Sequence, residues 1–263
     1  MRISKQAGLS LIELMIALTL GLILTLGVIE IFLSSKRSYT VVTAQSETQE
    51  NGRVVKHFLG RGLRHAGFWS DPTVPRFFPA QGVFQADQIF SATNNDSTDA
   101  SVVDGTDTVT VRFNGAADQL LRGCTGMAPD ASQVIVDRYY LRPAGGNTNV
   151  PSLMCQSQLL DFDGNVVSTD TQQLILGIED FQVELGIGSA DRIVRYVAPD
   201  AVTDWLDVRS VRYALIATSN NDTAGQANNT TYNLVTGESY TAPGDNRIRQ
   251  VHRETVFLRN FRG

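Results

Sequence analysis

The chain has 263 residues, 42% of them hydrophobic and 19% charged, and a net charge of -5. This length is enough for one large hydrophobic core or two small ones. The acidic balance argues against nucleic acid as the main partner, because binding to phosphates requires clustered lysine and arginine.

The N-terminus carries a short basic leader, ending at Gly8, and then a long apolar run. The run from Ser10 to Leu33 is long enough, at about 1.5 Å per helical residue, to cross a membrane core of roughly 30 Å. It is too long for the apolar region of a cleaved secretory signal peptide. The length suits an uncleaved signal anchor, but a signal anchor would not explain Gly8 and Glu13.

Glu13 is a carboxylate near the start of the apolar run. An ionised carboxylate inside a transmembrane helix costs roughly 2.5–3.5 kcal/mol or more, so its presence calls for a compensating positive charge. Cleavage after Gly8 would create one by freeing the amino group of Leu9. The N-terminus therefore predicts a subunit that is processed, held in a membrane and then built into an assembly.

The residues from Gly8 to Ala17 resemble the N-terminus of the type IV pilin and pseudopilin superfamily, in which a basic leader ends in glycine and the fifth residue after the cut is glutamate. The resemblance implies that a prepilin peptidase cuts between Gly8 and Leu9 and that the new N-terminus at Leu9 is methylated. It also implies that the Glu13 carboxylate pairs with the α-amino group of a neighbouring subunit during assembly. Many members have phenylalanine after the cut, where this chain has Leu9.

A second helical pattern follows the apolar run. Apolar residues recur at intervals of three and four up to Ala66, and Gly67 suits a helix end, so we expect one nearly continuous helix from Leu9 to about Ala66. Glu30 lies close enough to the outer membrane boundary to reach the interface, and a contact with a partner subunit is the alternative. The basic residues beyond the membrane segment are interpreted as a solvated helix face: Lys36, Arg37, Arg53, Lys56, Arg61 and Arg64.

Three glycines, Gly52, Gly60 and Gly62, interrupt the second half of this helix. Each weakens the helix by roughly 1 kcal/mol relative to alanine. Close packing against a sheet or against a partner helix would explain them, and both explanations stay open.

Beyond Phe68 the pattern changes to loops and short strands. Loops are expected over 68–84 and 94–108, and strands over 108–113, 133–141, 151–160, 172–178, 180–187, 191–197, 208–218 and 254–259. Short strands with little helix predict an antiparallel sheet. The expected fold class is α+β, a pilin fold with a long N-terminal transmembrane helix packed on an antiparallel β-sheet head. The expected division is a leader (1–8), a transmembrane helix (9–33), a periplasmic half of the helix (34–67) and a β-rich head (68–263).

The two cysteines, Cys124 and Cys155, fit neither a C-x-x-C motif nor a zinc pattern. If the C-terminal part lies outside the cytoplasm, we expect one disulfide, which would contribute roughly 3–4 kcal/mol in the chain-entropy model. The alternative is two unrelated buried thiols.

No motif for catalysis or for a cofactor is found. The chain lacks G-x-S-x-G, a phosphate-binding glycine loop and H-E-x-x-H, so an enzyme is not expected. The stretch Asp161–Asn165 starts like a calcium loop but is interpreted as a turn between strands. Four further aspartates are interpreted as a solvated loop and the three histidines as surface or packing residues: Asp96, Asp99, Asp104, Asp107, His57, His65 and His252.

Internal blocks narrow the resemblance to PilW-type minor pilins: 50–53, 63–68, 177–183, 205–213 and 256–260. The resemblance implies a minor pilin that catalyses no reaction and takes part in a priming or tip complex of a type IV pilus. Implied partners are other minor pilins, the major pilin, the prepilin peptidase, the inner-membrane assembly platform and the lipid bilayer. The implied location is the inner membrane, with a single pass and a periplasmic head, or the extracellular pilus.

Two alternatives stay open. One is a GspJ-like pseudopilin of type II secretion, which shares the architecture. The other is a membrane-anchored periplasmic binding module that never polymerises and keeps residues 1–8.

Overall fold

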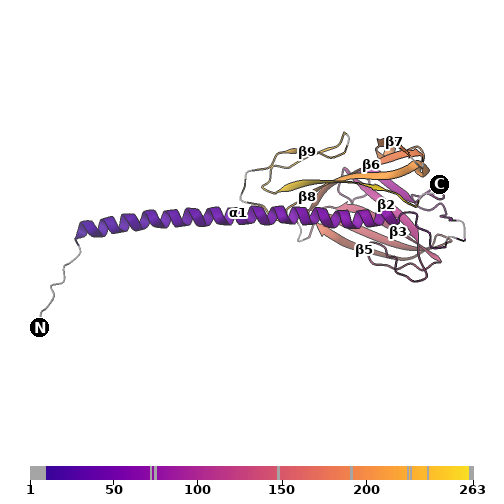
Figure 1. Ribbon diagram of the computed structural model, residues 1–263, viewed down its shortest axis with the longest axis horizontal. Helices are drawn as coiled ribbons and strands as arrows, with labels where there is room; N and C mark the ends of the chain where they lie inside the picture. Colours follow the sequence, from indigo (N-terminus) through magenta and orange to yellow (C-terminus); the bar gives the residue numbers. More distant parts are fainter. Residues whose placement is uncertain are drawn as a thin grey trace.

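The computed structural model describes residues 10–71, 73, 76–146, 149–189, 192–223, 225, 227–235 and 237–260. One long helix, α1 (Leu11–His65), projects from a β-rich head, so that its N-terminal part stands free of the head (Figure 1). The head contains β1 (Phe90–Asp96), β2 (Thr106–Asn114), β3 (Gln133–Arg142), β4 (Ser152–Asp161), β5 (Val166–Leu176), β6 (Ile178–Ser189), β7 (Arg192–Val197), the 3-10 turns η1 (Pro199–Ala201) and η2 (Trp205–Asp207), β8 (Val208–Thr218), β9 (Thr231–Asn233), β10 (Ser239–Thr241) and β11 (Arg249–Phe257).

The strands form two main sheets and one short hairpin. Their orders are β1-β2-β3-β4-β5, β11-β8-β6-β7 and β10-β9, and all pairings are antiparallel. The distal half of α1 packs on β8 and β11 of one sheet and on β2 and β5 of the other. Figure 1 shows β6 and β8 on one side of α1 and β3 and β5 on the other. The α+β fold class is confirmed, with two main sheets where the sequence predicted one.

The main core lies where α1 and the two sheets meet. Val55, Leu59 and Leu63 on α1 and Phe181 and Tyr213 on the second sheet are each at most 1% exposed. The helical spacing of four residues between Val55, Leu59 and Leu63 places all three on the face of α1 that contacts the head.

The C-terminal segment of the chain caps α1. Gly67 adopts φ +75°, which favours glycine, and its N–H donates to the carbonyl of Arg112 (2.9 Å). The side chain of Asn260 donates to the carbonyls of Arg64 (3.1 Å) and Ala66 (3.2 Å), which the helix leaves without partners. The predicted end of the helix is therefore confirmed to within one residue.

Gly177 marks the point at which the chain passes from one sheet to the other. The sequence predicted a strand through it, over 172–178, but the structure ends β5 at Leu176 and begins β6 at Ile178. Gly177 has φ +83°, and a Cβ there would meet the carbonyl of Thr218 at 2.6 Å. β1 and the β9–β10 hairpin were not predicted.

Two of the three helix glycines face the head. A Cβ at Gly52 would collide with the ring of His252 in β11, and a Cβ at Gly62 would collide with the hydroxyl of Tyr139 in β3. At Gly60 a Cβ would meet only the mobile end of a side chain on the same helix, 3.1 Å from Arg64. Packing against the sheets therefore explains Gly52 and Gly62.

Alanine substitutions of these glycines are expected to have opposite effects. Gly52→Ala and Gly62→Ala should lower the free energy of unfolding by about 1–3 kcal/mol, because the added methyl group overpacks the contact with the sheet. Gly60→Ala is the matched control and should raise it by up to about 1 kcal/mol, because alanine favours helix. Thermal unfolding of the full chain in detergent checks this, and equal destabilisation by all three would contradict it.

Candidate assembly site

Glu13 lies in the first turn of α1 and takes part in a capping box. Ser10 is the N-cap residue; its Oγ accepts a hydrogen bond from the Glu13 N–H (3.2 Å), and its own N–H donates to Oε2 of Glu13 (2.9 Å). This reciprocal pair holds the carboxylate at the positive end of the helix dipole. Ser10 was not predicted as part of this site, although Ser-x-x-Glu before an apolar run is the sequence pattern of a capping box. Only Oε2 accepts a hydrogen bond among the described residues, so Oε1 is available to a cation.

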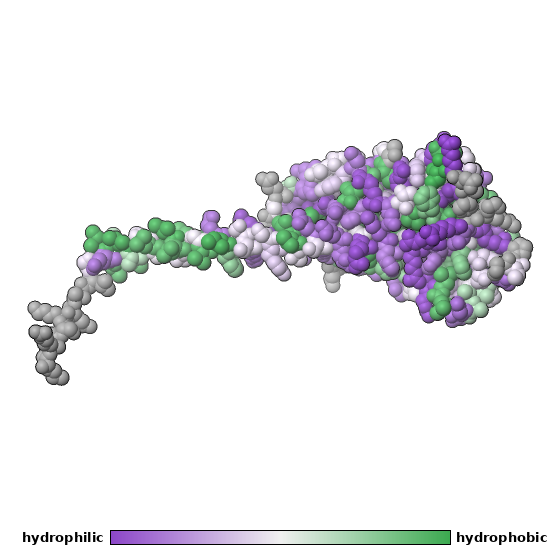
Figure 2. All heavy atoms as spheres, in the orientation of Figure 1, coloured by the Kyte–Doolittle hydropathy of each residue, from purple (hydrophilic) through white to green (hydrophobic). Residues whose placement is uncertain are grey.

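The N-terminal part of α1 is an uncovered apolar surface. Within the described part of the chain, α1 is the one helix long and apolar enough to cross a membrane. All of its residues from Leu11 to Leu33 are exposed, and Figure 2 shows apolar residues along the projecting part of the helix. A helix of a soluble protein buries one apolar face, so this all-round surface requires a membrane or other subunits to cover it.

Two residues of the predicted processing site, Gly8 and Leu9, lie outside the described residues. Cleavage between them therefore stays a prediction. Glu30 is exposed on α1, and both of its interpretations stay open.

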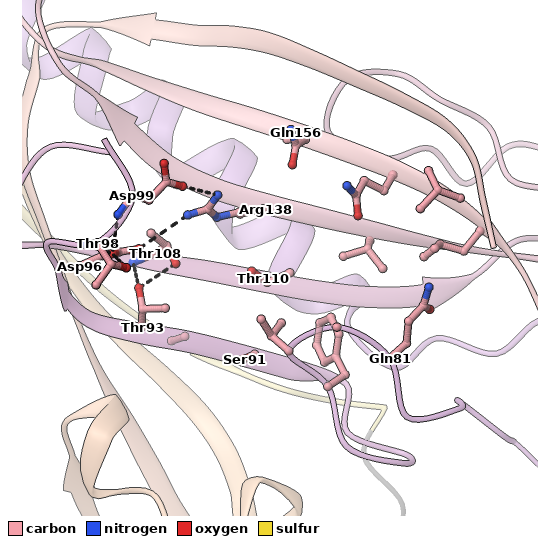
Figure 3. A pocket seen from close by; sticks show the side chains of 18 residues that line it. Gln81, Ser91, Thr93, Asp96, Thr98, Asp99, Thr108, Thr110, Arg138 and Gln156 are labelled. Carbon is pink, nitrogen blue, oxygen red and sulfur yellow. Dashed lines mark hydrogen bonds and ion pairs between the residues drawn. The ribbon is translucent and has the colours of Figure 1, made fainter. Parts of the chain in front are cut away.

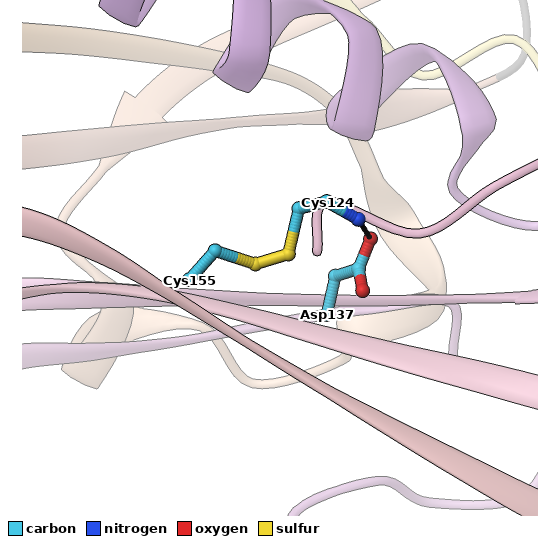
Figure 4. Close-up of side chains that lie close together, drawn as sticks. All are labelled: Cys124, Asp137 and Cys155. Atoms are coloured by element: carbon cyan, nitrogen blue, oxygen red, sulfur yellow. Dashed lines mark hydrogen bonds between the residues drawn. A yellow bond between two sulfur atoms is a disulfide. The ribbon is translucent and has the colours of Figure 1, made fainter. Parts of the chain in front are cut away.

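The two cysteines meet beside a buried carboxylate (Figure 4). Cys124, in the loop before β3, and Cys155, in β4, form a disulfide, with their Cα atoms 6.2 Å apart. Asp137 accepts hydrogen bonds from the Cys124 N–H (2.8 Å) and from the Ser157 hydroxyl (2.6 Å). The crosslink therefore fixes the 115–132 loop to the five-stranded sheet.

Cys124, Asp137 and Cys155 also form a group of potential metal ligands, with their ligand atoms within 4.8 Å of one another. A metal would require the thiolates, which the disulfide removes. Both oxygens of Asp137 accept hydrogen bonds, and burial raises the pKa of this carboxyl to about 6. The disulfide and these hydrogen bonds account for the grouping without an ion.

The aspartate-rich segment is not the solvated loop that the sequence predicted. Asp96 ends β1 and Asp107 lies in β2, and both are buried. The prediction failed because the polar residues flanking them also pair as strands. Asp104 remains in the connecting loop and is exposed.

Asp96 and Asp99 pair with Arg138 at one end of a cleft of about 580 Å³ on the outer face of the five-stranded sheet (Figure 3). Arg138 lies 3.7 Å from Asp96 and 3.0 Å from Asp99. Hydrogen bonds from Ser101 and then from Arg138 lower the pKa of Asp99 to about 2. Each charged side chain that lines the cleft therefore has an ion-pair partner within the chain, although the two carboxylates share one arginine.

Asp107 joins the two sheets. One of its carboxylate oxygens accepts a hydrogen bond from the Asn95 N–H in β1 (2.8 Å), and the other accepts one from the Val183 N–H in β6 (2.7 Å). Burial raises the pKa of Asp107 to about 7, and the nearby Asp180 adds to this effect, although the two hydrogen bonds act against it. The native state thus holds a proton that the unfolded chain releases near pH 3.8.

Asp107→Asn is expected to change the pH dependence of stability. A raised native pKa stabilises the fold below the unfolded pKa, and this contribution is lost as the pH rises toward about 7. The difference in free energy of unfolding between wild type and Asp107→Asn should therefore shrink between pH 5 and pH 8. The change is about 1.4 kcal/mol for each pH unit between pH 5 and the native pKa of about 7. Urea unfolding at both pH values measures it.

Asp99→Asn is the control for this experiment. The pKa of Asp99 is lowered, so its contribution is lost only as the pH falls below its ordinary value of 3.8. The Asp99→Asn curve should run parallel to wild type from pH 5 to pH 8. A parallel curve for Asp107→Asn as well would contradict the assignment.

The remaining candidate residues lie as the sequence predicted. Asp161 accepts hydrogen bonds from Asn165 in the turn between β4 and β5. His65 packs edge-on against Phe113, with ring centroids 5.5 Å apart, and His252 packs on α1 with Nε2 3.1 Å from the carbonyl of Thr48.

Two family models match the chain. One is described as Type IV Pilus-assembly protein W and matches residues 138–260, and the other as a prokaryotic N-terminal methylation motif and matches residues 3–29. Among solved structures, a type IV-like pilin from Thermus thermophilus is similar, with a TM-score of 0.45 and 16% sequence identity over 83% of this chain and 98% of that chain. No curated protein matches the chain. The two family matches thus cover the apolar start of α1 and the head from within β3 to the residues after β11.

Proposed function

We propose that this chain is a type IV minor pilin of the PilW type, and that it is a non-catalytic subunit of a small complex that primes pilus assembly or occupies the pilus tip. The matches to the Pilus-assembly protein W and N-terminal methylation models support the proposal. The partners of the subunit are other minor pilins, the major pilin and the inner-membrane assembly platform. The observation that carries the proposal is an exposed apolar helix with the carboxylate of Glu13 in its first turn.

The match to the N-terminal methylation motif supports the proposed topology. The basic leader stays in the cytoplasm, residues 9–33 span the inner membrane, and residues 34–263 lie in the periplasm. A prepilin peptidase cuts between Gly8 and Leu9, and Leu9 is methylated. A disulfide between Cys124 and Cys155 is consistent with an oxidising periplasm.

Glu13 provides charge complementarity in the proposed assembly. Its Oε2 accepts from the Ser10 N–H, which leaves Oε1 for the α-amino group of Leu9 in a neighbouring subunit. Pairing replaces two uncompensated charges with one ion pair in a poorly hydrated region, where each charge alone is costly. The apolar helix supplies the packing surface, and the head supplies the specificity between neighbours.

Deletion of the gene tests the proposed function. Surface pili are counted, and twitching motility and secreted enzymes are measured in the same cultures. Loss of pili with normal secretion supports the proposal. Lost secretion with normal pili would overturn it in favour of a type II secretion pseudopilin, and a mature chain that still carries residues 1–8 would favour an anchored module that never polymerises.

A further inference from the structure

The distal half of α1 presents a row of basic residues on the face turned away from the buried residues of the helix. Arg53, His57, Arg61 and Arg64 are exposed. Their spacing of three and four residues places them on one helix face over about 17 Å. We call these four residues the basic ridge. The buried residues Val55, Leu59 and Leu63 lie on the other face, so the head leaves the ridge uncovered.

Among the described residues, the basic ridge forms one ion pair. Glu50 pairs with Arg53 along the helix (2.6 Å), and both side chains are exposed. No carboxylate of the described residues lies within ion-pair distance of Arg61 or Arg64, although Arg61 interacts at longer range with the buried carboxyl of Asp137. A cationic face therefore stands on a chain whose net charge is -5.

A cleft continues the ridge at its distal end. It has a volume of about 360 Å³ and lies between α1, the 122–126 loop and β5, where Arg61, His65 and Arg122 line it. Asp137 also lines it, but both of its carboxyl oxygens accept hydrogen bonds from Cys124 and Ser157. The hydroxyl of Thr125, which also lines it, is buried without a hydrogen-bond partner. Burial and the charges of Arg61 and Arg64 lower the pKa of His65, as expected in a positive surrounding. The cleft thus offers hydrogen-bond donors and positive charge to an acidic side chain.

We propose that the basic ridge and this cleft dock a carboxylate-rich face of a neighbouring pilin subunit. This inference rests on the proposed function and names the chemistry of the partner. The ridge begins about 30 Å beyond Leu33 on the same continuous helix, a height that the helix and head of a neighbouring subunit anchored in the same membrane also reach. Nucleic acid is disfavoured as the occupant because the rest of the chain is acidic and would repel phosphates.

In vivo crosslinking of the full chain tests the docking surface. His57, in the middle of the ridge, is replaced by p-benzoylphenylalanine in the native host, and the crosslinked residues are mapped by mass spectrometry. The expected product is a pilin segment that contains several aspartates or glutamates. Arg53→Glu, Arg61→Glu and Arg64→Glu together should reduce its yield at least about tenfold, because like charges then face each other.

Two further variants make the experiment decisive. Arg192→Glu with Arg195→Glu reverses two exposed charges on β7, away from the ridge, and should leave the yield unchanged. Changing the mapped carboxylates of the partner to lysine should restore the yield of the triple variant. A yield that survives charge reversal, a mapped segment without carboxylates, or a crosslink to nucleic acid would overturn the docking proposal. These outcomes are distinct from failure of the proposed function, in which deletion of the gene leaves pili intact.

Discussion

Glu13→Ala is expected to insert in the membrane as the wild type does but to lose its place in the pilus-assembly complex. The substitution leaves the α-amino group of the neighbouring subunit without a partner in a poorly hydrated region. An uncompensated charge there costs roughly 2.5–3.5 kcal/mol, which corresponds to about a hundredfold loss in association. Expression from the chromosome, followed by membrane fractionation and a count of surface pili, measures both parts of the expectation.

Two control variants separate the charge of Glu13 from its role in the helix cap. Glu13→Gln keeps a side-chain acceptor for the Ser10 N–H but carries no charge, so we expect the same loss of assembly as with alanine. Ser10→Ala removes the reciprocal bond to the Glu13 N–H but keeps the charge, so it should assemble. Normal assembly of Glu13→Gln at native expression would show that the carboxylate only caps the helix.

Removal of the disulfide is expected to lower the free energy of unfolding by about 3–4 kcal/mol, because it frees a loop that the crosslink closes in the unfolded chain. The two cysteines are 31 residues apart in sequence. For a chain of this size the loss corresponds to a fall in Tm of about 10 °C. Alanine is the suitable replacement because Cys155 is fully buried, and serine would place a hydroxyl in the core.

Single and double variants test the crosslink together. Cys124→Ala alone should cost nearly as much as Cys124→Ala with Cys155→Ala, because either change breaks the same bond. Thiol titration of the denatured, unreduced wild type should find no free thiol. Two titratable thiols, or a double variant that unfolds at the wild-type temperature, would contradict a stabilising disulfide.

Much of the fold follows from local patterns in the sequence. The continuous helical period predicts α1, and alternating apolar residues predict β2, β3, β4 and β8 to within two residues of their observed ends. The spacing of Gly8 and Glu13 predicts the candidate assembly site. β1 escapes prediction because its second half, Thr93–Asp96, is polar and reads as loop.

Other features depend on contacts between distant parts of the chain. Arg112 is fully buried in β2, where its guanidinium donates hydrogen bonds to the carbonyls of Gln88 (2.5 Å), Pro79 (2.6 Å) and Gln85 (2.7 Å). These bonds hold the 79–88 loop against the sheet. Nothing in the neighbouring sequence distinguishes this arginine from an exposed strand residue. Asp107 is similar, because its partner Val183 lies 76 residues away.

The sequence by itself determined the membrane-length helix, its acidic first turn and the β-rich head, because periodicity and residue spacing act over a few neighbouring residues. Only the tertiary structure decided that Gly52 and Gly62 face the sheets, that Asp107 is buried between the two sheets, and that the basic ridge of α1 is uncovered. The physical reason is that burial, steric fit and charge compensation are set by residues that meet only after the chain has folded.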